Sequence, residues 1–473
     1  MQTTTLENSI RALEQKVRSF KGAFSLNDAA AVTGLAVDEA KEALDAMMSK
    51  YVCRLMVTEN GDMIYSFGHS LQRRGEKTWA ERWDQIGEWA WKVFTVIFKA
   101  WIAVTLVVYF VVFLVLLIAL LVAATQGGGR DRKSPVKLDG IFRMFFSIFQ
   151  WRTATTMIQY QTDRQGYRYR HYQPRPSVLN ENKKNFIASV YDFVFGPARV
   201  QIDPLANEKE VAAYLRKEKG IITPAELIAL GGKKTDEAEA FLSECIVRFK
   251  GDADITDNGV VYGRFDQLTR GMEGIEEGKI EYFWDEYEPE YEITGNTSGR
   301  NVGVIFMNAF NLVFSGSILY MFYTSGHTVN IPNERLVVLF LGWLPFIFSL
   351  LFFGVPIARA FKIRKLKKLR LEMNKRKRIM RVVFQKPNKS ATIEEIIAGV
   401  NSGKSEKPLL AKEIEQCLES MMRDYQGETQ LDSGGKVLYA FPRIADEMNE
   451  AMRLRANRNR EKDLGDVIFD SKG

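Results

Sequence analysis

Cysteine and histidine, the residues that most often act as nucleophiles or metal ligands, are few and scattered in this chain. The 473 residues contain Cys53, Cys245, Cys417, His69, His171 and His327. Metal and redox sites are recognised in sequences by closely spaced ligands such as C-x-x-C, and this chain has no such spacing. We also find no P-loop, G-x-G-x-x-G, nucleophile elbow or H-E-x-x-H motif. We therefore expect no cofactor, no metal site, no catalytic residues and no enzymatic activity.

One set of polar residues lies inside an apolar stretch. Asn308, Asn311 and Ser315 fall at i, i+3 and i+7, on one face of a helix. Such a face either makes hydrogen bonds between membrane helices or lines a polar path. Because no ionisable residue lies in this stretch or in the next apolar one, we favour hydrogen bonding between helices. A small channel or transporter subunit is the least favoured alternative.

The positive charge of the chain is concentrated in one run. The formal charge is +7, but residues 359–386 hold thirteen Lys or Arg and one acid, so this run carries +12 and the rest of the chain −5. A basic run directly after an apolar segment is typical of a cytoplasmic membrane flank, attracted to anionic lipid by about 1 kcal/mol per cation. The predicted lipid-facing cations are Arg359, Lys362, Arg364, Lys365, Lys367, Lys368 and Arg370.

Three apolar segments, residues 101–124, 302–323 and 336–357, are long enough to cross a bilayer core, which needs about 20 helical residues. The second and third are joined by a short polar loop and form a predicted transmembrane hairpin, with Pro345 and Pro356 expected to kink or end the last helix. Both flanks of the first segment are basic, so charge does not orient it. If it spans, the N-terminal region lies outside; we lean slightly to the alternative, in which it does not cross.

Outside the apolar segments and the basic run, the chain contains a module that occurs three times. Each copy reads as a short helix, a longer helix and a β-hairpin, which is the order of a winged helix. The second copy also shows an N-cap signature, Thr223-Pro224 followed by Glu226. Each hairpin tip needs a residue with positive φ. The glycines at the predicted tips are Gly61, Gly259 and Gly435.

The longer helices of the three copies are acidic, which argues against the commonest use of a winged helix, DNA binding. Their acids are Asp38, Glu39, Glu42, Asp45, Asp236, Glu237, Glu239, Glu244, Glu413, Glu415 and Glu419. Placing such a surface in a phosphate-lined groove is electrostatically unfavourable. We therefore expect protein contacts, and keep a membrane-tethered nucleic-acid-binding regulator as the alternative.

Three stretches within residues 186–268 resemble an uncharacterised winged-helix-repeat membrane-protein family of bacteria, cyanobacteria and chloroplast envelopes. They are VYDFVFGP (190–197), EKEVAAYLRKEKGIITPAEL (208–227) and RFKGDADITDNGVVYGRF (248–265). The resemblance implies a membrane location and carries no catalytic motif. Members are sometimes labelled iron–sulfur biosynthesis proteins, a label that the separate cysteines of this chain do not support.

The sequence thus predicts an α+β membrane protein with three winged-helix-like modules attached to a transmembrane helical region. The predicted divisions are module 1 (1–70), an interfacial helix (71–92), a first apolar segment (93–125), a basic and aromatic linker (126–200) with an in-plane helix (139–151), module 2 (201–270), an acidic linker (271–300), the transmembrane hairpin (301–358), a basic helix (359–386), module 3 (387–445) and a solvated, charged helical tail (446–473). We expect a homo-oligomeric scaffold of the bacterial inner membrane, bound to anionic lipid, with modules 2 and 3 cytoplasmic.

Overall fold

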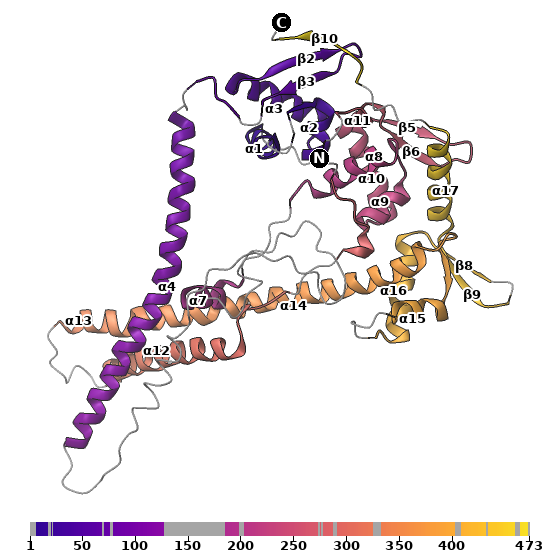
Figure 1. Ribbon diagram of the computed structural model, residues 1–473. Helices are drawn as coiled ribbons and strands as arrows, with labels where there is room; N and C mark the ends of the chain where they lie inside the picture. The colour runs from indigo at the N-terminus through magenta and orange to yellow at the C-terminus, as the bar shows by residue number, and fades with distance from the viewer. Residues whose placement is uncertain are drawn as a thin grey trace.

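The computed structural model describes residues 6–17, 20, 22–68, 71–75, 79–126, 185–197, 203–272, 275, 278–286, 291–324, 333–402, 408–431, 434–458 and 464–471. Over these residues the chain is mainly helical, with three small antiparallel sheets and three long apolar helices (Figure 1). The segment 139–151, for which the sequence predicts an in-plane helix, lies outside the described residues, as does most of the predicted linker 126–200.

Unit 1 (residues 6–66) starts with a helix and ends with a β-hairpin. Its elements are α1 (Leu6–Val17), β1 (Ala23–Ser25), α2 (Leu26–Thr33), α3 (Val37–Lys50), β2 (Arg54–Thr58) and β3 (Met63–Ser66). A capping box starts α2: the backbone N–H of Asp28 donates to Oγ of Ser25 (3.1 Å), and the backbone N–H of Ser25 donates to the Asp28 carboxylate (2.8 Å). Gly34, with φ +71°, ends the helix.

Unit 2 (residues 206–269) repeats this order. Its elements are α8 (Ala206–Lys217), β4 (Ile221–Ile222), α9 (Pro224–Gly231), α10 (Thr235–Phe249), β5 (Asp252–Ile255), β6 (Val261–Arg264) and α11 (Asp266–Thr269). Pro224 stands in the first turn of α9, and the backbone N–H of Thr223 donates to the Glu226 carboxylate (3.1 Å). The capping signature in the sequence therefore marks the start of α9.

Unit 3 (residues 379–456) takes its first helix from the end of a much longer one. Its elements after α14 (Leu344–Phe384) are β7 (Ser390–Thr392), α15 (Ile393–Val400), α16 (Ala411–Asp424), β8 (Glu428–Leu431), β9 (Val437–Ala440) and α17 (Pro442–Ala456). Ile379, Met380, Val383 and Phe384, on the last turns of α14, are buried in one hydrophobic core with side chains of units 2 and 3. The last turns of the predicted basic helix are therefore part of unit 3.

The three sheets have one topology. The short strand before the second helix pairs with the last hairpin strand, giving the orders β1-β3-β2, β4-β6-β5 and β7-β9-β8. Phe24 lies opposite Tyr65 in unit 1, and Ala391 lies opposite Tyr439 in unit 3. Unit 1 alone has a fourth strand in the described residues, β10 (Val467–Asp470), which pairs with β2. The end of the chain thus lies against its beginning (Figure 1).

The long helices cross predicted boundaries. One continuous helix, α4 (Trp79–Gln126), covers both the predicted interfacial helix and the first apolar segment. The second helix of the predicted hairpin is also continuous: α13 (Glu334–Val337), a π-helical turn η3 (Val338–Trp343) and α14 follow without a break. Pro345 stands in the first turn of α14 and Pro356 lies inside it, so neither proline ends the helix at Ile357. Neighbouring helices commonly make such prolines tolerable in membrane helices.

The charged helix predicted at the C-terminal end of the chain is packed against another unit and is not surrounded by solvent. Instead of a solvated helix, α17 is packed against unit 2, with Ile444, Glu447, Glu450 and Arg455 buried. Three of its buried residues, Glu447, Glu450 and Arg455, are charged, so the helix lacks the continuous apolar stripe by which burial is read from a sequence.

Candidate functional site

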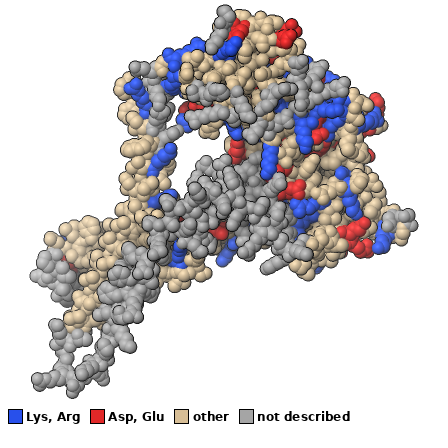
Figure 2. All heavy atoms as spheres, viewed as in Figure 1, with Lys and Arg blue, Asp and Glu red and all other residues tan. Residues whose placement is uncertain are grey.

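Three helices are long and apolar enough to cross a membrane. They are Trp89–Ala123, Ser298–Thr324 and Glu334–Phe384, which lie in α4, in α12 (Ser298–Thr324) and in the run from α13 to α14. Together with α7 (Phe186–Phe195) they form a separate hydrophobic cluster that includes Leu106, Val190, Met307 and Phe352. In Figure 2 their described surface, at the lower left, carries few charges. The chain is therefore associated with a membrane through these helices.

The polar face of α12 joins this cluster together. Asn308 donates from Nδ2 to the backbone carbonyl of Ser349 on α14 (3.1 Å), and Asn311 donates from Nδ2 to the carbonyl of Leu106 on α4 (3.0 Å). Ser315 donates to the carbonyl of Asn311 in its own helix (2.7 Å). Side chains of all three polar residues are fully buried. One helix face thus makes a hydrogen bond to each neighbouring apolar helix, where small residues and amides commonly stabilise packing.

The basic run lies along α14 after the apolar cluster. Among the predicted lipid-facing cations, the exposed ones are Lys362, Arg364, Lys365, Lys367 and Lys368. Arg359 is half-buried and donates to the carbonyl of Val194 on α7 (3.3 Å), while Arg370 is buried. The exposed set therefore follows directly after the membrane helices, and the two other cations belong to packed parts of the chain.

In the second half of the basic run, the end of α14 contacts unit 3 through ion pairs as well as through the hydrophobic core. Arg376 donates to the Asp424 carboxylate (2.6 Å) and to the Tyr425 hydroxyl (3.0 Å), both at the end of α16. Burial opposes ionisation of Asp424, but Arg376 and then Lys234 outweigh it and lower the pKa of that carboxyl. The helix that leaves the apolar cluster is therefore fixed in unit 3.

A buried ion pair joins unit 1 to unit 2. The Asp28 carboxylate, fully buried, lies 2.7 Å from the guanidinium of Arg216 on α8, whose side chain is 5% exposed. The same carboxylate accepts from the backbone N–H of Met272 (3.0 Å), beyond α11. In a second contact, Arg248 of α10 donates to the carbonyl of Gly34 (3.2 Å). Unit 1 therefore contacts unit 2 through groups that water does not screen.

A second buried ion pair joins unit 2 to α17. The Arg455 guanidinium donates to both oxygens of Glu226, over 2.6 and 2.8 Å, and to the backbone carbonyl of Ile221 (2.6 Å). Glu226 also accepts from the hydroxyl of Tyr214 (2.7 Å), whose pKa is raised chiefly by burial and then by this carboxylate. Asp28 and Glu226 hold the same place in their capping boxes. The sequence signals the box of Glu226, but not the arginines that pair with the two carboxylates.

The C-terminal strand completes the connection between units. Arg54 of β2 forms an ion pair with Asp470, and the backbone N–H of Ser471 donates to the carbonyl of Leu55 (2.9 Å). Between α17 and β10, Arg458 pairs with Asp266 of unit 2. The tail therefore contacts unit 2 and then unit 1.

The glycines at the three hairpin tips have the same backbone conformation, but only the second tip borders a groove. Gly61, Gly259 and Gly435 have φ of +78°, +78° and +76°. A Cβ at any of the three would meet no atom within 4 Å, so only backbone conformation requires glycine there. Gly259 borders a groove between units 2 and 3. Its neighbour Asn258 donates a hydrogen bond to Glu450 of α17 (2.5 Å).

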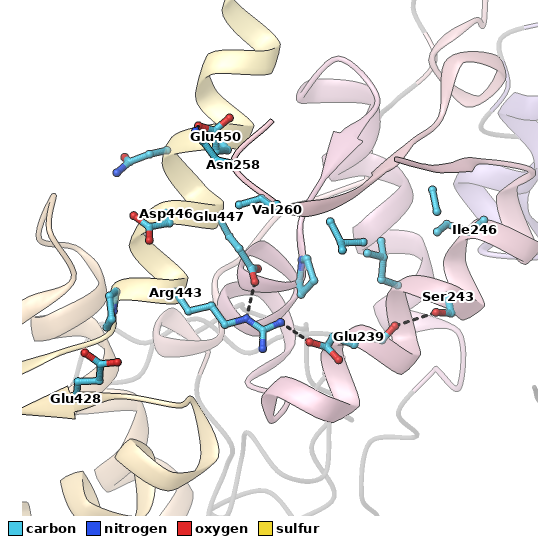
Figure 3. Close-up of a pocket in the computed structure, with 17 residues that line it drawn as sticks. Glu239, Ser243, Ile246, Asn258, Val260, Glu428, Arg443, Asp446, Glu447 and Glu450 are labelled. Atoms are coloured by element: carbon cyan, nitrogen blue, oxygen red, sulfur yellow. Dashed lines mark hydrogen bonds and ion pairs between the residues drawn. The ribbon is translucent and has the colours of Figure 1, made fainter. Parts of the chain in front are cut away.

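This groove lies between α10, the β5–β6 hairpin, α17 and the start of β8 (Figure 3). Its volume is about 970 Å³. Arg443 of α17 reaches across to Glu239 of α10 and also pairs with Glu447 (2.8 Å). Burial raises the pKa of Glu447, although Arg443 and the backbone N–H of Ala225 (2.7 Å) act in the opposite direction.

The cysteines lie in three separate units. Cys245 is buried, and Cys53 and Cys417 are half-buried. Burial raises the pKa of all three thiols, that of Cys417 to about 11. Within the described part of the chain, no group of three or more His, Cys, Asp or Glu is arranged to hold a metal ion.

No family model matches the chain, and no solved structure resembles it. It is similar to an uncharacterized chloroplastic protein of Arabidopsis thaliana, with 23% identity over 374 residues. The match covers 72% of this chain and 66% of that protein, so the chain spans just under two thirds of its relative's length. The match is compatible with the resemblance to chloroplast-envelope proteins drawn from the sequence.

Proposed function

We propose that the protein is a membrane-anchored scaffold in which units 1 to 3 are winged-helix modules that make protein–protein contacts and self-assemble. The observation that carries this proposal is the joining of the units by two buried ion pairs, Asp28–Arg216 and Glu226–Arg455. A buried ion pair holds its partners in one geometry, because removing one partner leaves an uncompensated charge. The units therefore form a single body that can hold several partners at fixed positions.

All three units belong on one side of the membrane. Helix α4 begins after unit 1, α12 begins after unit 2, and α14 ends inside unit 3. The units contact one another, and in Figure 1 the opposite ends of the three helices gather at the lower left, away from the units. From the sequence alone, we expect unit 1 to lie on the outer side of the membrane if the first apolar segment crosses it. The packing of α7 near Phe98 and Lys99, in the half of α4 nearer unit 1, supports a return of the chain to that side before unit 2.

The basic run supports a cytoplasmic position of that side at a bacterial inner membrane, because cations flanking membrane helices favour the cytoplasmic side. Its five exposed cations follow the apolar cluster on α14 and attract anionic lipid. Nucleic-acid binding is disfavoured, since α17 lies beside α10 and adds Asp446 and Glu450 to a surface that is already acidic.

The test of the scaffold is the mass of the detergent-solubilised protein by multi-angle light scattering. We expect a stable oligomer, and a monomer at all concentrations would overturn self-assembly.

The test of the lipid contact is the amount of phosphatidylglycerol that co-purifies in neutral detergent. We expect the triple variant Lys362→Gln, Lys365→Gln, Lys368→Gln to retain less of this lipid than the wild type. The matched control removes three exposed lysines of the units, Lys41, Lys412 and Lys436, and should retain the wild-type amount. Equal loss in both variants would contradict the role of α14.

A further inference from the structure

We propose that the groove between units 2 and 3 binds a cationic peptide segment of a protein partner, one in which Arg or Lys residues alternate with apolar residues. This inference rests on the scaffold function and names the kind of partner that one of its surfaces takes. The groove is built from both units, so it exists only when the two are joined.

The charges that line the groove are unbalanced. Five carboxylates, from Glu239, Glu428, Asp446, Glu447 and Glu450, face one lining cation. That cation, the guanidinium of residue 443, is already paired with the first and fourth of these acids. The charges of Glu428 and Asp446 are therefore available to a positively charged ligand, and Glu450 is paired through one oxygen with Arg453, outside the lining.

Glu450 adds an independent indication of a ligand. It is 8% exposed, and its Oε1 accepts from Asn258 and from Arg453 (3.4 Å). Its Oε2 is buried without a hydrogen-bond donor among the described residues, at a position that lines the groove. A buried carboxylate oxygen without a donor is costly, and the donors that satisfy it best are charged N–H groups.

The remaining lining is apolar. Leu242 and Ile246 of α10, Val260 and Val261 of the hairpin, and Pro442 of α17 lie between the acids. A polyamine would leave this apolar surface uncovered, and the phosphates of a nucleic acid or a lipid would be repelled by the carboxylates. A peptide with alternating cationic and apolar side chains contacts both parts of the lining, because successive side chains of an extended peptide point to opposite sides.

The binding test uses the full-length protein in neutral detergent and a short fluorescein-labelled peptide of alternating arginine and leucine. Fluorescence anisotropy at low salt, with protein-free micelles as the blank, gives its Kd. We expect Asp446→Asn to raise Kd about fivefold and Glu450→Gln about tenfold. The matched control is Asp236→Asn, an exposed acid at the start of α10 outside the groove, which should change Kd less than about twofold.

Three results would overturn the inference: no binding by the wild type, an equal effect of the control variant, or equally tight binding of an arginine–glycine peptide. The two test variants should fold, since Asp446 is exposed and Glu450→Gln keeps the shape of the side chain. Light scattering on the same samples separates the two proposals. If the protein is an oligomer that does not bind the peptide, only the proposal of peptide binding in the groove is excluded. If it is a monomer that binds the peptide, only self-assembly is excluded.

Discussion

Replacing Arg455 by methionine should detach α17 from unit 2. The guanidinium makes two short hydrogen bonds to Glu226 and two to backbone carbonyls, those of Ile221 (2.6 Å) and Glu218 (3.1 Å). Methionine keeps the apolar stem of the side chain but none of these donors. Glu226 then stays buried as an unpaired charge, and the hydrogen bonds left to it come from the Tyr214 hydroxyl and from the backbone N–H and hydroxyl of Thr223.

The size of the effect follows from that unpaired charge. The side chains of Arg455 and Glu226 are 11% and 6% exposed, so solvent does not compensate for the loss. Breaking such a pair from one side costs about 3 to 5 kcal/mol. At about 1.4 kcal/mol for each tenfold change, the equilibrium constant for opening α17 should rise at least about 100-fold.

Hydrogen exchange of the detergent-solubilised protein, read by mass spectrometry on peptides from α17, measures this opening directly. We expect protection to fall by about two orders of magnitude in Arg455→Met, and by less than about threefold in Arg453→Met, which removes an exposed arginine of the same helix. The double variant Arg455→Met, Glu226→Gln should regain part of the protection, because no buried charge is left. If the double variant exchanges as fast as the single one, packing rather than charge holds α17 and the reasoning is refuted.

Three other predictions follow from contacts in the structure. Tags at residue 2 and at the C-terminus should have the same protease accessibility in intact membranes, because β10 pairs with β2; opposite accessibility would exclude this arrangement. Asn311→Leu should destabilise the apolar cluster by about 1 kcal/mol in detergent-induced unfolding, because it removes the hydrogen bond to α4. The control Ser317→Ala removes a hydrogen bond within one exposed turn of α12 and should not destabilise the cluster; equal effects would argue against the contact with α4. With the other two cysteines replaced, Cys417 should react with iodoacetamide near pH 8 about 100-fold more slowly in the folded protein than in the unfolded protein. Its pKa of about 11 leaves little thiolate, so the reaction should become faster as pH rises. Equal rates in the folded and unfolded protein would contradict the burial of this thiol.

The repeated units could be anticipated from the sequence because their signals are local. Helical periodicity, the Thr223-Pro224 start and the glycine hairpin tips each depend on a few neighbouring residues. The first helix of unit 3 could not be separated from the membrane helix before it, because no residue between Pro356 and Phe384 stops the helix. A continuous helix has no boundary to read, even where its surroundings change from lipid to protein core.

The contacts between units were not visible in the sequence for a different reason. Arg216 and Arg455 look like the solvated cations that commonly end helices, and their acidic partners lie far away in the chain. Only Asn308 and Asn311 were conspicuous, because an amide within an apolar stretch has to find a partner nearby. The groove was missed because its walls come from two units.

The three capping carboxylates show how repeated units can be joined in a fixed order. Asp28 pairs with an arginine of unit 2, and Glu226 with an arginine of unit 3, so each of these boxes is closed by the unit that follows it in the chain. The equivalent Glu395 is 53% exposed and pairs with Lys386 of its own unit. An exposed pair of this kind contributes little, whereas the two buried pairs are costly to break. The order of the units along the chain is therefore also their order in space, and β10, by returning to unit 1, connects the last unit to the first.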